Sequence, residues 1–202
     1  MKPNPSDPIR LFQERETLAM HPAVPWSPAT VELLFDALAF AAHKHQNQRR
    51  KGDEEAPYIT HPIAVARVLA VEAGLQDGVL LAAAVLHDTL EDTDSSHDEL
   101  TARFGLAVAD LVGEVSDDKG LSKAERKRRR IQTAAAMSQG ARLLLLADKI
   151  CNLRDIIANP PRGWDVERKR EYFDWAHAVV MEIEGTHTLL EEIFQAAYAA
   201  RP

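Results

Sequence analysis

The stretch VLHDTLEDTD, residues 85–94, places His87 and the acidic side chains of Asp88, Glu91, Asp92 and Asp94 directly after an apolar run. Residues three or four positions apart share a helix face, so several of these carboxylates are expected to lie close together. Like charges at such distances repel one another unless a cation or a proton intervenes. Imidazole together with carboxylate suits Mn, Fe or Zn better than Ca. A divalent metal site explains the pattern, and an exposed helix end with solvated acids is the alternative.

Two further residues point to the same chemistry from other parts of the chain. His61 stands at the start of a predicted helix, and Asp148 interrupts the apolar run LLLLADKI. A buried aspartate needs a partner, which can be a metal ion or a cation such as Lys149. The order His61…His87-Asp88…Asp148, spread over three predicted helices, is more specific than any of its parts. If the carboxylates mainly repel one another, replacing Asp148 with alanine costs the metal-free fold little stability.

Such a site suits hydrolysis of a phosphoester or a pyrophosphate, which is anionic and repels hydroxide. One metal ion can lower the pKa of bound water and neutralise an oxygen on the phosphorus. Glu91 or Asp92 is then placed to accept the proton of the water or to hold it in line, an effect worth roughly 10²–10⁴ in rate. The anionic substrate also needs local positive charge, and five basic residues can supply it: Arg49, Arg50, Lys51, Lys149 and Arg154. For the basic run KAERKRRR, residues 123–130, a solvated helix face is favoured over phosphate contacts.

The elements that must position these residues are all predicted to be helices. Proline in the first turn marks the helices that start near Pro28 and His61, and Ser-x-x-Glu capping boxes mark those that start at Ser96 and Ser122. Polar residues with Gly and Pro make 49–60 a loop. Apolar spacing predicts helices over residues 28–48, 61–74, 77–90, 96–105, 107–115, 123–137, 141–157, 165–183 and 187–199. No alternating strand pattern is visible, so the prediction is an all-α fold in a single domain.

Composition narrows the class of protein. The chain has 202 residues, of which 46% are hydrophobic, enough to bury the core of one domain. A net charge of −7 and a pI near 5.6 argue against binding to nucleic-acid phosphates. No apolar stretch is long enough to span a bilayer, no signal peptide is visible, and the single Cys151 suits a reducing compartment. We therefore expect a cytoplasmic protein without a membrane or nucleic-acid partner. Proline-rich residues 1–26 are predicted to form a flexible N-terminal arm, and residues 27–200 the domain.

Several motifs together resemble those of the HD superfamily of metal-dependent phosphohydrolases. HDxxED at residues 87–92 is accompanied by YIxHP at 58–62 and LADKxxNLRD at 146–155. The combination is most similar to the hydrolase domain of the RelA/SpoT alarmone enzymes, and especially to the stand-alone small alarmone hydrolases of the metazoan type. Shorter matching segments are RRK (49–51), FG (104–105), VSDDK (115–119) and EYFDWA (171–176). The resemblance extends over nearly all of residues 30–195 and implies a single HD-domain helical bundle.

The resemblance assigns roles to the histidines and acids by position. It implies that one Mn²⁺ ion per chain is held by four ligands, His61, His87, Asp88 and Asp148. It also implies that Glu91 and Asp92 lie over the metal and position or activate water. A degenerate HD domain that only senses nucleotides is expected to have lost ligands or the acidic pair. Because both are intact, an enzyme is favoured over such a sensor.

Substrate contacts are predicted for four residues. The resemblance implies that Arg50 and Lys51 approach guanine and phosphate and that Asn152 lies near ribose and phosphate, and Arg154 adds local positive charge. The chain departs from the long RelA/SpoT enzymes in its loop GDEEAPY, which is longer and more acidic. It departs again at Asp155, where a threonine is common in the long forms, although the stand-alone type shares the aspartate.

The predicted function follows from this resemblance. We expect a hydrolase that removes the 3′-pyrophosphate of guanosine 3′,5′-bispyrophosphate (ppGpp or pppGpp), the nucleotide of the stringent response, to give GDP or GTP and pyrophosphate. A synthetase activity is not expected, because the chain has no room for the further domains of the long enzymes. The alternative is an HD phosphohydrolase that acts on NADPH or another nucleotide. The predicted partner is a small-molecule nucleotide, and no oligomeric state is predicted.

Overall fold

The described part of the chain is built from helices. The computed structural model describes residues 26–52 and 55–202, and within them the only extended pairing is one antiparallel bridge between Arg49 and Pro57. The helices are α2 (Pro28–Lys44), α3 (Thr60–Arg67), the π-helical η2 (Val68–Glu72), α4 (Gly78–Leu86), α5 (Thr89–Asp92), α6 (His97–Phe104), α7 (Leu106–Val115), α8 (Lys123–Ala134), α9 (Gln139–Ala158), α10 (Val166–Met181) and α11 (Thr188–Tyr198). The predicted all-α fold is confirmed. The predicted N-terminal arm, residues 1–26, lies outside the described residues except for Trp26.

Helix α4 lies at the centre of the fold because it is apolar on every side. Its sequence GVLLAAAVL has no charged residue, and every residue from Leu80 to Leu86 is buried. Asp77 caps its start by accepting hydrogen bonds from the backbone N–H groups of Val79 and Leu80. Helices α2, α3, α7 and α9 pack around it. Its last turn therefore delivers the following residues, His87 and Asp88, into the interior.

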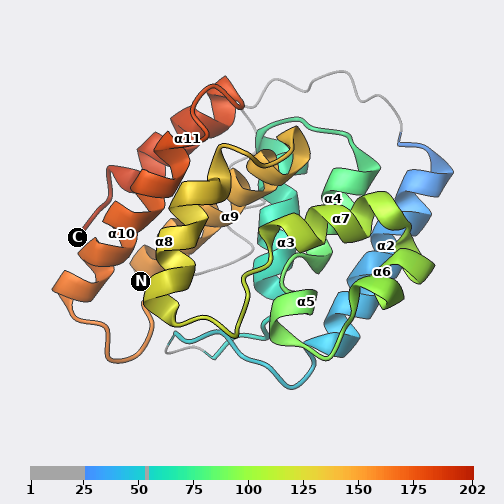
Figure 1. Cartoon of the computed structure of the whole chain (residues 1–202), viewed down its shortest axis with the longest axis horizontal. Coiled ribbons are helices and arrows are strands. Elements are labelled where there is room, and N and C mark those ends of the chain that lie inside the picture. Colours follow the sequence, from blue (N-terminus) through green and yellow to red (C-terminus); the bar gives the residue numbers. More distant parts are fainter. Residues whose placement is uncertain (1–25, 53–54) are drawn as a thin grey trace, which may run out of the picture.

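Helix α9 is the other long core helix. Ser138 starts it by accepting a hydrogen bond from the backbone N–H of Ala141, and residues 143–147 are all buried. It contacts α3, α4 and α7 as well as α10 and α11, and in Figure 1 it lies between these two groups of helices. This position explains how Asp148 can face residues of α3 and of the α4–α5 region.

The helix predicted to continue to residue 90 is interrupted at the predicted metal ligands. It ends at Leu86, and α5 begins at Thr89. Two side chains donate hydrogen bonds to backbone carbonyl oxygens in the last turn of α4. His87 Nδ1 donates to Ala84 O at 2.8 Å, and Thr89 Oγ1 donates to Leu86 O at 2.7 Å. Side chains that hydrogen-bond to the backbone in this way compete with the regular ladder. His87 and Asp88 therefore lie in a turn between two helices rather than within one.

Other helix boundaries follow the predicted caps more closely. Ser122 and Glu125 form the full reciprocal capping box of α8, and Ser96 accepts a hydrogen bond from the backbone N–H of Glu99 at the start of α6. Helix α2 is shorter than predicted and ends at Lys44. Within the described residues, no helix is both long enough and apolar enough to cross a membrane.

Candidate active site

Three packed elements carry the predicted metal ligands. His61 lies in the first turn of α3, His87 and Asp88 lie in the turn between α4 and α5, and Asp148 lies in the middle of α9. Because α3, α4 and α9 pack against one another, these four side chains meet at one place. The two histidines are buried and the two aspartates are partly exposed. The structure thus brings together all four residues to which the sequence assigned metal binding.

The four side chains face one another at distances that suit a shared ion. His61 Nε2 lies 3.1 Å from Asp148 Oδ1 and 4.0 Å from Asp88 Oδ2. His87 Nε2 lies 3.1 Å from Asp88 Oδ2 and 3.8 Å from Asp148 Oδ1. One potential ligand atom each from His61, His87 and Asp88 lies within 4.8 Å of the other two. Ligands placed about 2.0–2.2 Å from a first-row ion span separations of this order.

One histidine is already oriented as a metal ligand. A carbonyl oxygen can only accept, so the 2.8 Å hydrogen bond to Ala84 O assigns a proton to His87 Nδ1. Its other nitrogen, Nε2, faces the two aspartates, is buried and has no hydrogen-bond partner among the described residues. A metal-ligating histidine typically donates its second ring N–H to a carbonyl or carboxylate in this manner. The donor set of two imidazoles and two carboxylates therefore fits a divalent first-row ion.

The surrounding charges keep the carboxylate of Asp148 ionised. Burial alone would raise the pKa of Asp148, but Lys149, followed by His61 and His87, holds that pKa well below its usual range. Lys149 Nζ lies 2.8 Å from Asp148 Oδ2, and Asn152 Nδ2 donates to Asp148 Oδ1 at 2.6 Å. Both neighbours fix the orientation of the carboxylate. Its ionised form is the one that binds a cation.

Protons compete with a cation at the same histidine, His87. Burial disfavours the charged imidazolium of His87, but the carboxylates of Asp88 and Asp148 outweigh burial and raise the pKa of His87 to about 9. A metal ligand must be deprotonated, so binding of an ion at Nε2 displaces a proton from the ring. The same carboxylates that attract the cation thus also attract the proton that it replaces.

The acidic pair Glu91 and Asp92 lies on α5, one turn beyond the HD dipeptide. Glu91 Oε2 accepts a hydrogen bond from the backbone N–H of Asp117 at 3.1 Å, and its Oε1 lies 3.5 Å from Arg126 Nη1. Asp92 accepts a hydrogen bond from Lys119 Nζ. Burial is the main reason why the pKa of Glu91 is raised above its ordinary value. A carboxylate with a raised pKa is a better proton acceptor near neutral pH, which favours Glu91 as the general base.

These residues line a cavity of about 210 Å³. Its wall is formed by Arg50, Tyr58, His61, His87, Asp88, Glu91, Asp92, Val115, Asp117, Arg130, Leu144, Leu145, Asp148, Lys149, Asn152 and Trp175. Of the predicted substrate-binding residues, Arg50 and Asn152 belong to this wall, whereas Lys51 and Arg154 do not. Arg154 instead donates two hydrogen bonds to Glu72, at 3.0 and 2.9 Å. For Lys51 and Arg154, substrate contact stays a prediction.

Tyr58 is a wall residue to which the sequence assigned no role. Its hydroxyl donates to Asp88 Oδ2 at 2.7 Å and lies 3.2 Å from Asp92 Oδ2. Burial, followed by the nearby charge of Asp88, raises the pKa of Tyr58, so the hydroxyl keeps its proton and remains a donor. The signal was present in the YIxHP motif, but the motif alone does not show which atoms the tyrosine reaches.

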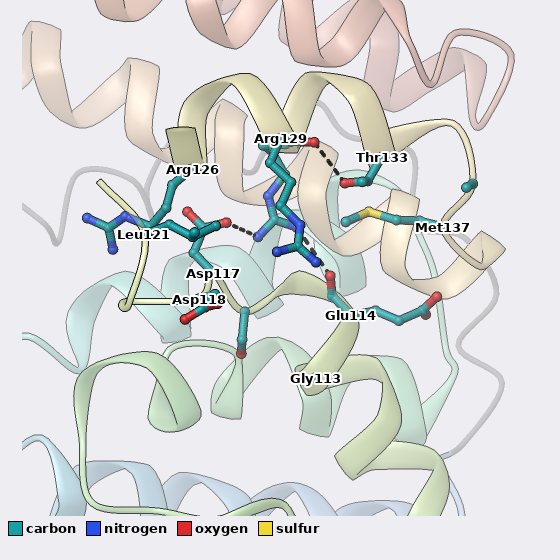
Figure 2. Close-up of a pocket in the computed structure, with 12 residues that line it drawn as sticks. Gly113, Glu114, Asp117, Asp118, Leu121, Arg126, Arg129, Thr133 and Met137 are labelled. Atoms are coloured by element: carbon teal, nitrogen blue, oxygen red, sulfur yellow. Dashed lines mark hydrogen bonds and ion pairs between the residues drawn. The ribbon is translucent and has the colours of Figure 1, made fainter. Parts of the chain in front are cut away.

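The basic helix α8 is also linked to the acidic pair through Asp117. Most of the run is exposed, as predicted, but Arg130 is only 7% exposed. Arg130 donates to the backbone carbonyls of Glu114 and Val115 and to the carboxylate of Asp117. Asp117 and Arg130 line both the first cavity and a second one of about 340 Å³ beside α8, which Figure 2 shows. Because the backbone of Asp117 also binds Glu91, this wall fixes one side of the acidic pair.

Comparisons with known proteins identify close relatives of this chain. The sequence profile of the HD domain family matches residues 37–174. A mouse (Mus musculus) protein named guanosine-3′,5′-bis(diphosphate) 3′-pyrophosphohydrolase MESH1 is 52% identical over 168 residues, which cover 83% of this chain and 94% of the mouse protein. The bifunctional (p)ppGpp synthase/hydrolase SpoT of Escherichia coli (strain K12) is 38% identical over 184 residues, which cover 85% of this chain but 25% of SpoT.

The structural comparison agrees with the sequence comparison. A solved structure described as a metazoan ortholog of SpoT that hydrolyses ppGpp and plays a role in starvation responses superimposes with a TM-score of 0.81. The two chains are 44% identical, and the match covers 91% of this chain and 98% of the other. The chain therefore belongs to the HD domain family and, within it, to the group that contains the MESH1 proteins.

Proposed function

We propose that this protein hydrolyses guanosine 3′,5′-bis(diphosphate) and its 5′-triphosphate analogue and releases the 3′-diphosphate as pyrophosphate. The proposal rests on one observation above all: two histidines and two aspartates converge beside Glu91 in a cavity whose wall also holds Arg50. This arrangement combines a cation site, a proton acceptor and positive charge for an anionic substrate. The mouse relative is named for this activity, and the solved relative is described as hydrolysing ppGpp.

The proposed cofactor is one Mn²⁺ ion per chain, held by His61, His87, Asp88 and Asp148. When bound, a divalent ion neutralises charge on the phosphate that is cleaved and supplies a nucleophilic water at neutral pH. Imidazole and carboxylate ligands accept several first-row ions, so the donor set supports this class of ion. Restoring activity to chelator-treated protein with Mn²⁺, Fe²⁺, Zn²⁺ or Mg²⁺ in turn tests the choice of Mn²⁺.

The protein side chains have separate tasks in the proposed reaction. Glu91 accepts a proton from the attacking water, and Asp92 holds that water in line with the bond to be broken. The water oxygen bonds to the inner phosphorus of the 3′-diphosphate, the bond between that phosphorus and the 3′-oxygen breaks, the 3′-oxygen takes up a proton, and pyrophosphate leaves. Arg50 and Asn152 donate hydrogen bonds to phosphate and ribose oxygens. Lys149 lies too close to Asp148 to be free for the substrate, so its proposed task is to hold that carboxylate.

The identity of the products tests the proposed reaction directly. With ppGpp and Mn²⁺ we expect GDP and intact pyrophosphate in equal amounts, because the attacked phosphorus is the inner one of the 3′-diphosphate. Phosphorus NMR of the reaction mixture distinguishes pyrophosphate from orthophosphate. NADPH and nucleoside monophosphates, tested in parallel, measure the preference for the bispyrophosphate. Orthophosphate as the first product, or faster turnover of NADPH than of ppGpp, would replace the proposal with a phosphatase that acts on terminal phosphates.

Replacing Arg50 with alanine is expected to weaken substrate binding more than it lowers the maximal rate. The guanidinium lies in the cavity wall, 2.5 Å from Asp155 and 5.6 Å from the centre of the Tyr58 ring, and its one ion pair among the described residues is with Asp155 and not with the acidic pair. Loss of a charged hydrogen bond is worth about 1.5–3 kcal/mol, so KM should rise about tenfold or more. We expect kcat to change by less than about threefold, since uniform binding contributes to KM alone.

A matched control is available for the Arg50 variant. Arg103 on α6 also packs over an aromatic ring, that of Phe40, at 5.1 Å, but does not line the cavity. Arg103→Ala should leave both kcat and KM unchanged. A fall in kcat with unchanged KM for Arg50→Ala would place Arg50 at the attacked phosphorus instead.

A further inference from the structure

Tyr58 lies where the metal ligands, the acidic pair and the substrate loop meet. Its hydroxyl is within hydrogen-bonding distance of Asp88 Oδ2, at 2.7 Å, and of Asp92 Oδ2, at 3.2 Å. The Asp88 oxygen is the same one that lies 3.1 Å from His87 Nε2. A single phenol thus bridges one proposed metal ligand and one member of the acidic pair. Among the described residues, no other side chain is recorded with hydrogen bonds to both carboxylates.

The ring of Tyr58 contacts two neighbouring side chains. The ring of His45, which is 2% exposed, stacks on it with centroids 4.8 Å apart and an interplanar angle of 28°. The guanidinium carbon of Arg50 lies 5.6 Å from the ring centre. A flat cation over an aromatic face is attracted by the ring quadrupole, so Tyr58 gives Arg50 a platform. The side chain therefore has little freedom to rotate away from the two aspartates.

The backbone of Tyr58 is also linked to Asp92 through hydrogen bonds of Gln48. Its N–H donates to Gln48 O at 3.1 Å, and Gln48 Nε2 donates to the backbone carbonyl of Asp92 at 2.6 Å. His45 Nδ1 lies 2.8 Å from Gln48 Oε1, which fixes the amide orientation. The loop that carries Arg50 and the short helix that carries Asp92 are therefore linked through residues that do not touch the proposed ion.

We propose that Tyr58 is a positioning residue with two separable tasks, and this inference rests on the proposed function. Its hydroxyl orients Asp88 toward the ion and Asp92 toward the attacking water, while its ring orients Arg50 toward the substrate. Partners that bind metal ligands from the outside typically change metal affinity or activity by about 10–100-fold when they are removed. The hydroxyl should therefore affect ion affinity and kcat, and the ring should affect KM.

Two substitutions separate these tasks. Tyr58→Phe removes only the hydroxyl, so it should weaken Mn²⁺ binding to the chelator-treated protein about tenfold and lower kcat at saturating Mn²⁺ about 10–100-fold, with KM unchanged. Tyr58→Leu removes the ring as well and should in addition raise KM about fivefold, as Arg50 loses its platform. Mn²⁺ binding is measured by electron paramagnetic resonance of the free ion, and the melting temperature shows whether each variant is folded.

The control removes an equivalent hydroxyl elsewhere. Tyr198 on α11 also donates to an aspartate, with its hydroxyl 3.3 Å from Asp174 Oδ1, and does not line the cavity. Tyr198→Phe should leave Mn²⁺ affinity, kcat and KM unchanged. The comparison therefore separates loss of the Tyr58 contacts from the general effect of a Tyr→Phe change.

A double-mutant cycle with Asp92→Asn tests whether Tyr58 acts through Asp92. At saturating Mn²⁺ in single-turnover experiments, Tyr58→Phe should lower the rate by less than about threefold in the Asp92→Asn background, because residues that act as a unit are not additive. Wild-type kcat in Tyr58→Phe, or full multiplication of the two effects, would overturn the inference. If the wild-type protein does not hydrolyse ppGpp, the proposed function fails, yet the Mn²⁺ titration still shows whether Tyr58 orients the ion site.

Discussion

Replacing Asp148 with asparagine is expected to lower ppGpp hydrolysis by at least about 10³-fold and to leave the protein without a bound ion. An ion that neutralises transition-state charge contributes several kcal/mol, and about 1.4 kcal/mol corresponds to each tenfold in rate. Asparagine keeps the shape of the side chain but removes the charge that attracts the cation. Metal content by mass spectrometry and initial rates with ppGpp measure the two effects together. Wild-type protein should behave in the same way in excess chelator and recover with Mn²⁺.

The control for this experiment is another ion-paired aspartate. Asp174 on α10 binds Arg201 with two hydrogen bonds of 2.7 Å and does not line the cavity. Asp174→Asn should keep its metal and its activity, since exposed ion pairs contribute little. Undiminished hydrolysis by wild-type protein in excess chelator, or an Asp148→Asn variant that stays loaded and active, would refute the proposed metal centre.

Asparagine is preferred to alanine at this position because of what surrounds the carboxylate. The sequence suggested that repulsion among carboxylates dominates, so that Asp148→Ala would cost little stability. The structure places the buried Lys149 Nζ 2.8 Å from Asp148 Oδ2, and a buried cation that loses its partner costs about 3–5 kcal/mol. That expectation about stability is therefore revised. Alanine leaves Lys149 Nζ without this acceptor and would confuse loss of the metal with loss of the fold, whereas the amide oxygen of asparagine can still accept a hydrogen bond from Lys149.

Glu91→Gln and Asp92→Asn are expected to retain the ion while kcat falls by about 10²–10⁴, the usual contribution of a positioned acid or base. Neither side chain is proposed as a metal ligand, and both lie on α5, which follows His87 and Asp88 in the chain. Metal content measured on the same samples as kcat separates binding from chemistry. A folded variant that has lost its ion would show that the acidic pair takes part in metal binding.

The pH profile distinguishes the two acids. Because burial raises the pKa of Glu91, protonation removes the proposed base at a higher pH than for an ordinary glutamate. The kcat of wild-type protein should therefore fall as the pH decreases through this raised pKa. The residual activity of Glu91→Gln should lack that acidic limb, whereas the residual activity of Asp92→Asn should retain it. An acidic limb in Glu91→Gln at the wild-type position would assign the base to another residue.

Much of the site could be predicted because residue type and local spacing determine it. The sequence alone shows that the apolar run before His87 is followed at once by Asp88 and further acids. It also shows an aspartate within the apolar run LLLLADKI. The order of these segments, and the resemblance carried by their motifs, predicted that His61, His87, Asp88 and Asp148 come together from three helical segments. The all-α fold followed from helical spacing of apolar residues and from Ser and Pro at helix starts.

The remaining features depend on contacts that neither residue type nor helical spacing indicates. No periodicity indicates that His87 Nδ1 takes the carbonyl of Ala84 and so helps to end α4 at Leu86. Nor does the sequence show that Arg154 is occupied by Glu72, or that Arg130 leaves the solvated face of α8. Such pairings are decided by tertiary packing, which can override local preference.

The turn at His87 and Asp88 has a consequence for the order in which the chain folds and acquires its metal. Its shape is held by hydrogen bonds to the carbonyls of Ala84 and Leu86, and the ligands on α3 and α9 are brought to it by core packing. In zinc fingers, by contrast, folding and metal binding are one event. Here we expect the newly made polypeptide to fold first and to bind its metal ion afterwards. The ion that it carries in a living cell should then reflect which first-row metal is in supply, and not only which one its ligands prefer.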